Sequence, residues 1–263
     1  NAKIQHYEIL IIDECHLVAP SEAGQYHQLI NNLKNVNPNL KILGLTATPY
    51  RLDSGYLTQW ETPIFERVVY KIDVKLLIKR GFLCPVVSNG GGVKVDVSKV
   101  KHKGGEFLDS ALESLYMSKT PEIVADIVKQ GINRKAWLIF CVSIEHAEQV
   151  TTELISHGVN AACYHSQSDN EYILDDFTHG RLRCLVNVNI LTTGSNFPIA
   201  DMCVLIRATE STALYVQIVG RVMRLYPDKQ NALLLDYGGN VMRHGCIDDV
   251  TVKAKGEGTG EAP

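Results

Sequence analysis

Short aliphatic runs alternate along the chain with segments whose apolar residues recur at helical spacing. The first run, residues 8–13, is continuous and closed by acids, as expected for a parallel strand that is buried on both faces. Helical spacing follows in residues 21–33, with Ser21 at the N-cap position. A second aliphatic run occupies residues 41–46. The order strand, helix, strand predicts one β-α-β unit at the start of the chain.

The same alternation returns from about residue 120 and predicts a second parallel α/β sheet. Its expected strands are aliphatic runs at residues 136–141, 160–164, 183–188, 202–206 and 232–236. Its expected helices are one capped by Ser143 and closed by Gly158, one at residues 171–177 and one at residues 211–225. Between the two sheets the chain is rich in Gly and Pro, which is typical of a linker, although residues 106–118 could be helical.

Length and composition agree with two globular lobes. The 263 residues correspond to about two domains, and 45% hydrophobic with 21% charged residues excludes a disordered chain. We expect residues 1–70 in a first lobe, 71–119 in a linker, 120–244 in a second lobe and 245–263 in a disordered tail. Because the chain starts at Asn1, enters a strand almost at once and shows no signal peptide, we expect a fragment cut upstream.

The charge and the cysteine content indicate which binding partners and which cellular compartment to expect. With 26 Lys and Arg against 29 Asp and Glu, the net charge is -3, so nucleic-acid binding would need a local groove. No apolar run approaches the roughly 18 residues of a membrane span, and no membrane partner is expected. The seven cysteines show no C-x-x-C spacing, which predicts buried free thiols in a reducing cytoplasm and no zinc site.

An acid pair stands where the first predicted strand ends. Asp13 and Glu14 lie at its carboxyl end, followed by Cys15 and His16. Ligands of open α/β sheets bind beyond that end. One carboxylate could hold Mg2+, and the other could orient or deprotonate an attacking water. The alternative is a solvated acidic turn.

Hydroxyl groups follow two further strands. Thr46 and Thr48 come after the second strand and could hydrogen-bond His16 or Glu14, although such a sequence is also common in ordinary turns. The segment 189–198 offers hydroxyls and backbone N–H groups in a Gly-containing turn, which can bind phosphate oxygens. An ordinary polar turn is the alternative there as well.

The predicted helix at residues 211–225 carries two guanidinium groups. Gln217, Arg221 and Arg224 stand at i, i+4 and i+7 and would share one face. Guanidinium groups suit the charge of a polyphosphate, whereas the alternative is a solvated basic face. Gly220 would cost roughly 1 kcal/mol inside this helix, which predicts a close packing contact there.

Four short motifs of the chain resemble, in their order, the motifs of superfamily 2 DEAD/DEAH-type helicases. They are Asp-Glu-Cys-His, Thr-Ala-Thr-Pro, Thr-Thr-Gly and Gln-x-x-Gly-Arg-x-x-Arg. Within that superfamily the chain is most similar to the bacterial RadD-like DNA-repair helicases. The resemblance covers about residues 1–240. It implies an α/β fold of two RecA-like lobes, the first incomplete at its N-terminus, that move on nucleic acid by hydrolysing ATP with Mg2+. It also implies single-stranded or branched DNA as partner, with RNA as the alternative, and DNA-repair proteins as further partners.

The resemblance also implies a role for each matching residue. Asp13 would coordinate Mg2+ through water, and Glu14 would activate the hydrolytic water. The remaining roles would be coupling for His16, Thr46 and Thr48, nucleic-acid contact for Thr192, Thr193 and (more weakly) His165, nucleotide contact for Gly194, Asn196 and Gln217, and phosphate contact for the arginine fingers Arg221 and Arg224.

The chain departs from the family pattern in two ways. No Gly-Lys-Ser/Thr tripeptide occurs in the 263 residues, although that loop supplies much of the affinity for phosphates, so ATP hydrolysis by this chain alone is in question. Asn196 replaces an Asp and Ser195 an aromatic residue; we expect tuning, since Asn still accepts a hydrogen bond from a ribose hydroxyl. Two alternatives stay open: a non-catalytic nucleic-acid-binding or annealing module, and a stable second lobe attached to a poorly folded first one.

Overall fold

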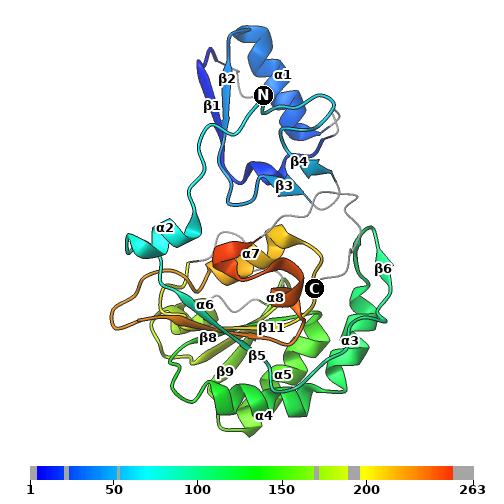
Figure 1. Ribbon diagram of the computed structural model, residues 1–263, viewed down its shortest axis with the longest axis vertical. Helices are drawn as coiled ribbons and strands as arrows, with labels where there is room; N and C mark the ends of the chain where they lie inside the picture. Colours follow the sequence, from blue (N-terminus) through cyan, green and yellow to red (C-terminus); the bar gives the residue numbers. More distant parts are fainter. Residues whose placement is uncertain (1–4, 21–23, 52–53, 169–171, 189–195, 251–263) are drawn as a thin grey trace. The chain divides into compact units, whose positions relative to one another are not determined.

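The computed structural model describes residues 5–20, 24–51, 54–168, 172–188 and 196–250, which fall into two compact units (Figure 1). Unit 1 ends at Lys71 and unit 2 begins at Ile72. Each unit has its own parallel sheet. The α/β class with parallel sheets is therefore confirmed.

Unit 1 is built on the predicted β-α-β unit. Its elements are β1 (Ile9–Ile12), the 3-10 turn η1 (Cys15–Leu17), α1 (Gln25–Val36), β2 (Lys41–Gly44) and the hairpin β3 (Tyr50–Arg51) with β4 (Gly55–Tyr56). Strands β1 and β2 run parallel, with Ile9 opposite Lys41. At the end of β2, a Cβ added to Gly44 would lie 2.7 Å from the Cys15 sulfur. A glycine there lets β2 and the turn after β1 pack directly on each other.

The sheet of unit 1 is covered on one face within the unit. Ile12 and Ile30 are buried, and α1 supplies that layer. By contrast, Ile9 and Ile11 are 56% and 60% exposed. The prediction that this strand is buried on both faces is wrong for unit 1 taken by itself, because its described residues provide only one covering layer.

Unit 2 is organised around six parallel strands in the order β5-β12-β11-β8-β10-β9. The strands are β5 (Val86–Gly90), β8 (Trp137–Cys141), β9 (Ala161–Tyr164), β10 (Cys184–Asn187), β11 (Met202–Ile206) and β12 (Ala232–Asp236). Every residue of β8, β10 and β11 is buried, as their continuous aliphatic sequences predict.

Helices cover both faces of this sheet (Figure 1). They are α2 (Val74–Lys79), α3 (Asp109–Met117), α4 (Thr120–Gln130), α5 (Ile144–Ser156), α6 (Tyr172–Thr178), α7 (Thr212–Gly220) and α8 (Asn240–His244), followed by the 3-10 turn η3 (Ile247–Asp249). Side chains of α3, α4 and α5 fill one apolar core, and those of α6 and α7 fill the other. Ser143 caps α5 as predicted, accepting the N–H of His146 at 3.1 Å. In the described ranges, no helix combines the length and the apolar character of a membrane span.

The segment expected to be a linker, residues 71–119, belongs almost entirely to unit 2. Strand β5 pairs with β12 and extends the sheet. Beyond it, alternate valines from Val93 to Val97 pack against the core, and the hairpin β6 (His102–Lys103) and β7 (Glu106–Phe107) leads into α3. The frequent glycines and prolines conceal this structure, because they mark turns between very short strands.

Two further expected boundaries also differ from the structure. Helix α7 ends at Gly220, after which Arg221, Val222 and Met223 donate to carbonyls three residues earlier, so the last turn tightens. The expected tail begins inside unit 2, because Ile247 is 7% exposed and packs in the core. The rest of that expected tail, residues 251–263, lies outside the described residues.

Candidate functional site

The acid pair of unit 1 projects from the carboxyl end of β1. Leu45 donates to the carbonyl of Ile12 at 2.9 Å and Cys15 donates to the carbonyl of Leu45 at 3.0 Å, so backbone pairing continues on both sides of the acids. Glu14 adopts φ 48° and ψ 45°, a left-handed conformation that is uncommon outside glycine and costs roughly 1 kcal/mol. The surrounding hydrogen bonds hold this strained turn in place.

The carboxylate of Asp13 suits a water-mediated magnesium contact. Its Oδ1 accepts the N–H of Glu14 at 2.9 Å, and the residue is exposed. This bond orients the carboxylate and leaves its other oxygen accessible to a metal-bound water. In the described part of the chain, no three His, Cys, Asp or Glu side chains gather closely enough to hold a metal directly. The second oxygen of the Asp13 carboxylate fits a contact to Mg2+ through water.

His16 connects Glu14 with the threonines that follow β2. The hydroxyl of Thr46 donates to the carbonyl of Thr48 at 3.1 Å and accepts the N–H of Thr48 at 3.0 Å. With its proton committed there, Thr46 accepts from His16 Nδ1, which lies 2.9 Å away. The same Nδ1 is 3.4 Å from Glu14 Oε2. The hydrogen bond that the sequence analysis allowed is thus present, while its coupling role stays a prediction.

Burial keeps His16 neutral. The side chain is 8% exposed, and burial lowers its pKa, with Glu14 opposing this effect and Arg51 adding to it. Arg51 also donates to the carbonyl of His16 at 3.0 Å, which joins η1 to β3. The hydroxyl oxygen of Thr48 is buried and has no hydrogen-bond partner in the described part of unit 1. This group of polar residues is therefore fixed around one neutral imidazole.

In unit 2, Asn196 and Arg224 come together. Asn196 follows β10, Arg224 follows α7, and Nη1 of the guanidinium donates to Oδ1 of the amide. The resemblance implied nucleotide contact for Asn196 and phosphate contact for Arg224, and the structure brings these two side chains together. The ammonium of Lys229 fixes this region by donating to the carbonyl of Arg224 at 2.9 Å and to that of Ala200 at 2.5 Å. Thr192, Thr193 and Gly194 lie outside the described residues.

Gln217, Arg221 and Arg224 do not form one helical face. Gln217 lies on α7 and is half-buried, Arg221 follows the helix and is 8% exposed, and Arg224 lies beyond it. The predicted packing contact at Gly220 is also wrong for unit 2, because a Cβ added there would have no heavy atom within 4 Å.

His165 lies in the turn after β9, where Nδ1 is hydrogen-bonded and Nε2 lies near an acid. Nδ1 accepts the N–H of Gln167 at 3.3 Å, and Nε2 lies 3.8 Å from Glu148 Oε1. The side chain is 15% exposed. Its proposed contact with nucleic acid stays a prediction.

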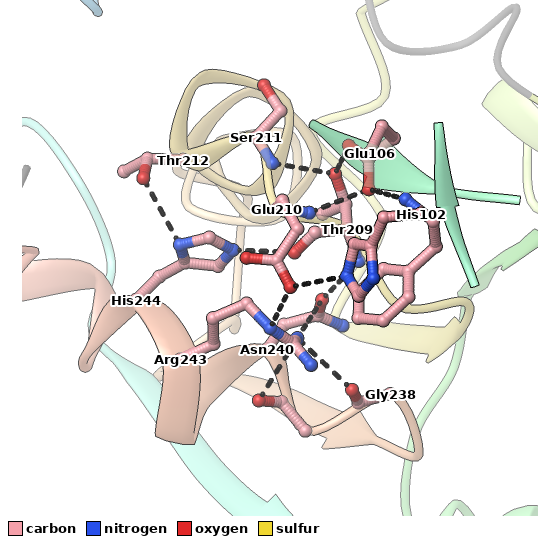
Figure 2. A network of polar contacts seen from close by, with 12 residues as sticks. His102, Glu106, Thr209, Glu210, Ser211, Thr212, Gly238, Asn240, Arg243 and His244 are labelled. Atoms are coloured by element: carbon pink, nitrogen blue, oxygen red, sulfur yellow. Dashed lines mark hydrogen bonds and ion pairs between the residues drawn. The ribbon is translucent and has the colours of Figure 1, made fainter. Parts of the chain in front are cut away.

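A buried polar network at the end of β11 was missed by sequence reasoning (Figure 2). Asn240, fully buried, accepts the N–H of Thr209 at 3.0 Å and donates to the carbonyl of Arg207 at 2.8 Å. His244 donates through Nε2 to the carbonyl of Thr209 at 2.9 Å, so its Nδ1 accepts from Thr212 Oγ1 at 3.1 Å. The network fixes the loop that starts α7. Its only local signal is the Gly-Gly pair before Asn240, since the partners are 31 to 35 residues apart.

Two family models match the chain. The model described as Helicase conserved C-terminal domain covers residues 119–226, and that described as Type III restriction enzyme, res subunit covers residues 1–51. Both matches support a superfamily 2 helicase of the DEAD/DEAH type. The first match lies in unit 2 and the second in unit 1, so the chain carries parts of both RecA-like lobes.

Two yeast proteins are similar to this chain. It is 28% identical over 242 residues to IRC3 of Saccharomyces cerevisiae, named as a candidate ATP-dependent helicase, covering 88% of the chain and 34% of the relative. It is also 28% identical to a candidate mitochondrial ATP-dependent helicase, irc3, of Schizosaccharomyces pombe, covering 94% and 41% respectively. The chain therefore spans well under half the length of these two relatives.

Solved structures agree on the fold. A fragment of a candidate HsdR subunit of a type I restriction enzyme from Vibrio vulnificus has a TM-score of 0.65 at 24% identity, covering 91% of this chain and 45% of that one. The helicase Lhr of Mycobacterium smegmatis, bound to single-stranded DNA and AMP-PNP, has a TM-score of 0.56 at 18% identity, covering 93% and 31%. At these identities the likeness concerns architecture.

Proposed function

We propose that the protein is an ATP-dependent DNA helicase or translocase that acts in DNA repair, as the RadD-like resemblance suggests. The observation that carries this proposal is the pairing of Asp13 and Glu14 with the His16–Thr46 hydrogen bond on unit 1. Arg221 and Arg224 of unit 2 supply guanidinium groups of the kind that phosphoryl transfer uses. A cytoplasmic location is part of the proposal and rests on the free cysteines.

The proposed mechanism gives the acid pair and the two guanidinium groups different tasks. Mg2+, when bound, neutralises phosphate charge next to Asp13. The Glu14 carboxylate accepts a proton from the attacking water, and the left-handed turn holds that carboxylate beyond the strand end. Arg221 and Arg224 stabilise the charge that develops on the transferred phosphoryl group.

The hydrogen bonds around His16 offer a route for coupling. Its Nδ1–H lies near both Glu14 and Thr46, at 3.4 and 2.9 Å. When the charge next to Glu14 changes on hydrolysis, this bifurcated contact shifts toward one partner. Thr46 is bonded to the backbone of Thr48, so the segment after β2 responds. We propose that this response moves the units along the strand.

The proposed partner is single-stranded or branched DNA held mainly by its phosphates. Binding should be sensitive to salt and nearly blind to sequence. The structure of Lhr contains bound single-stranded DNA, which supports this choice. RNA is the alternative partner, and a preference for RNA in a binding measurement would contradict the choice of DNA. Contact through Thr192, Thr193 and His165 belongs to the same proposal.

Substitution of Glu14 in the full-length protein tests the mechanism. Glu14→Gln should bind ATP yet lower nucleic-acid-stimulated hydrolysis about 100-fold or more, because the general base is lost. Phosphate release measures turnover, and a fluorescent ATP analogue measures binding. The matched control is Glu8→Gln, since Glu8 is exposed at the opposite end of the same strand and should retain activity.

Wild-type turnover in the Glu14→Gln variant would contradict the assignment. The second candidate function, a nucleic-acid-binding or annealing module without catalysis, is favoured by the missing Gly-Lys-Ser/Thr tripeptide in these 263 residues. It would be supported if the wild-type full-length protein binds strands but hydrolyses no ATP with any nucleic acid.

A further inference from the structure

A run of positive charge occupies the hairpin that precedes α3. Residues 94–103 contain four lysines and one histidine against a single acid, Asp96, in a chain whose net charge is -3. We call residues 99–107 the basic hairpin. Lys99, Lys101 and Lys103 are all exposed. Positive charge is therefore concentrated locally, as a nucleic-acid contact requires in an acidic protein.

The segment just before the hairpin directs the lysine side chains toward solvent. Val97 and Val100 pack against the core of unit 2, and Lys99 between them is exposed. Lys101 and Lys103 stand two positions apart next to and within β6, so they share one face at a spacing of about 6.6 Å. His102 points to the other face, where its ring centroid lies 4.4 Å from that of Phe107. Within the described part of unit 2, Lys101 and Lys103 are exposed on the opposite face.

A set of charged hydrogen bonds braces the hairpin (Figure 2). Oε2 of Glu106 accepts from the Thr209 hydroxyl at 2.6 Å, and Oε1 accepts the N–H of Glu210 at 2.8 Å. Arg243 lies over the Phe107 ring at 4.9 Å and pairs with Glu210 at 3.0 Å. Strands of two residues do not hold a hairpin by themselves. The brace therefore determines its orientation.

The brace places the hairpin at the carboxyl edge of the unit 2 sheet. Thr209 and Glu210 follow β11, which ends at Ile206. Asn196 follows β10 in the chain, and all six strands are parallel, so the segments after them leave from the same edge. At the hairpin tip, a Cβ added to Gly104 would meet no heavy atom within 4 Å. The tip is open to an approaching backbone.

We infer that the basic hairpin binds the phosphate backbone of nucleic acid through Lys101 and Lys103, and that Glu106 is the residue that positions it. This inference rests on the proposed function and extends the strand contact to a segment outside the helicase motifs. Charge complementarity identifies the partner, since lysines that face solvent in pairs neutralise phosphates and release counterions. The contact carries no base-specific group, so it is blind to sequence.

Fluorescence anisotropy with labelled single-stranded DNA of about 20 nucleotides tests the contact on the 263-residue chain. Lys101→Ala with Lys103→Ala should weaken binding and lower the slope of log affinity against log salt by about 1.4, for two lost phosphate contacts. The control is Lys129→Ala with Lys135→Ala, which removes the same charge from exposed positions just before β8, at the amino edge. The control should keep the wild-type slope.

Glu106→Gln separates bracing from simple electrostatics. Removing a negative charge next to the lysines should tighten binding if charge alone matters. Loss of the brace should instead weaken binding, while circular dichroism shows that the sheet remains folded. Tighter or unchanged binding would overturn the positioning role of Glu106.

The outcomes also separate this inference from the proposed function. If the wild-type chain binds the strand and the Lys101/Lys103 variant binds with the same salt slope, the hairpin contact is wrong and the helicase proposal stands. If neither the wild-type chain nor the full-length protein binds DNA or RNA, the proposed function fails and this inference fails with it.

Discussion

His146 is a fully buried histidine in α5 whose two ring nitrogens have no hydrogen-bond partner in the described part of the chain. Its ring stacks on Tyr116 at a centroid distance of 5.8 Å. Burial lowers its pKa to about 4, although Glu113 acts in the opposite direction. The folded chain therefore holds this imidazole neutral at pH values where the unfolded chain protonates it.

Acid should destabilise unit 2 through His146. Between about pH 6.5 and pH 4, the unfolded chain binds a proton that the folded chain excludes, so the free energy of unfolding falls as pH falls, by up to about 3 kcal/mol. His146→Phe should remove this part of the pH dependence. Urea unfolding followed by the fluorescence of the buried Trp137 at about pH 7 and about pH 4.5 measures the difference. Equal pH dependence in both proteins would refute the assignment.

For single residues, a contact can be predicted from the sequence only when its two partners are close together along the chain. Asp13, Glu14 and His16 are neighbours, so their letters alone indicated the site. The Glu106–Thr209 hydrogen bond joins residues 103 positions apart, and no local pattern marks either partner. The neutral state of His146 also has no letter-level signal, since it results from burial by α3 and α5 together.

Helix α7 shows that the helical spacing of apolar residues does not predict where a helix ends. Its sequence continues the apolar pattern to residue 225, whereas the helix ends at Gly220. The aliphatic runs of β8, β11 and β12 were predictable because each is long, buried and bounded by polar residues. Strands of two residues, such as β6 and β7, are too short for any period to be seen.

Two glycine substitutions should act in opposite directions. Gly220→Ala should raise the free energy of unfolding of unit 2 by roughly 0.5 to 1 kcal/mol, because the helical position is open around the added Cβ. The matched substitution Gly131→Ala should destabilise, since its Cβ would lie 2.7 Å from the Trp137 ring. Chemical denaturation of both variants measures the two shifts. Destabilisation by Gly220→Ala would show that residue 220 packs closely after all.

The two units differ in how completely their sheets are covered. Unit 2 buries three central strands between two helical layers. Unit 1 has two paired strands, and isoleucines are exposed on one face of them. A sheet of only two strands is marginally stable by itself. The sequence indicated this asymmetry, because it contains two core strands in the first lobe against five in the second.

Hydrogen exchange on the 263-residue chain should reveal this difference. Backbone amides of β1 and β2 should exchange faster than those of β8 and β11, because local opening of unit 1 exposes less apolar surface. Mass spectrometry of peptic peptides resolves the two regions. Equal protection across both sheets would mean that unit 1 is as stable as unit 2, against the expectation from its coverage.

Strand β12 lies between β5 and β11, although it comes last along the sequence. The region recognised by the helicase C-terminal family stops at residue 226, before this strand begins. A polypeptide trimmed to residues 119–226 would lose β12 together with β5, so β11 would become an edge strand with unpaired backbone groups. A polypeptide that contains unit 2 alone should therefore retain residues 72–250. Natural gene fusions that involve this unit are expected to join outside that interval.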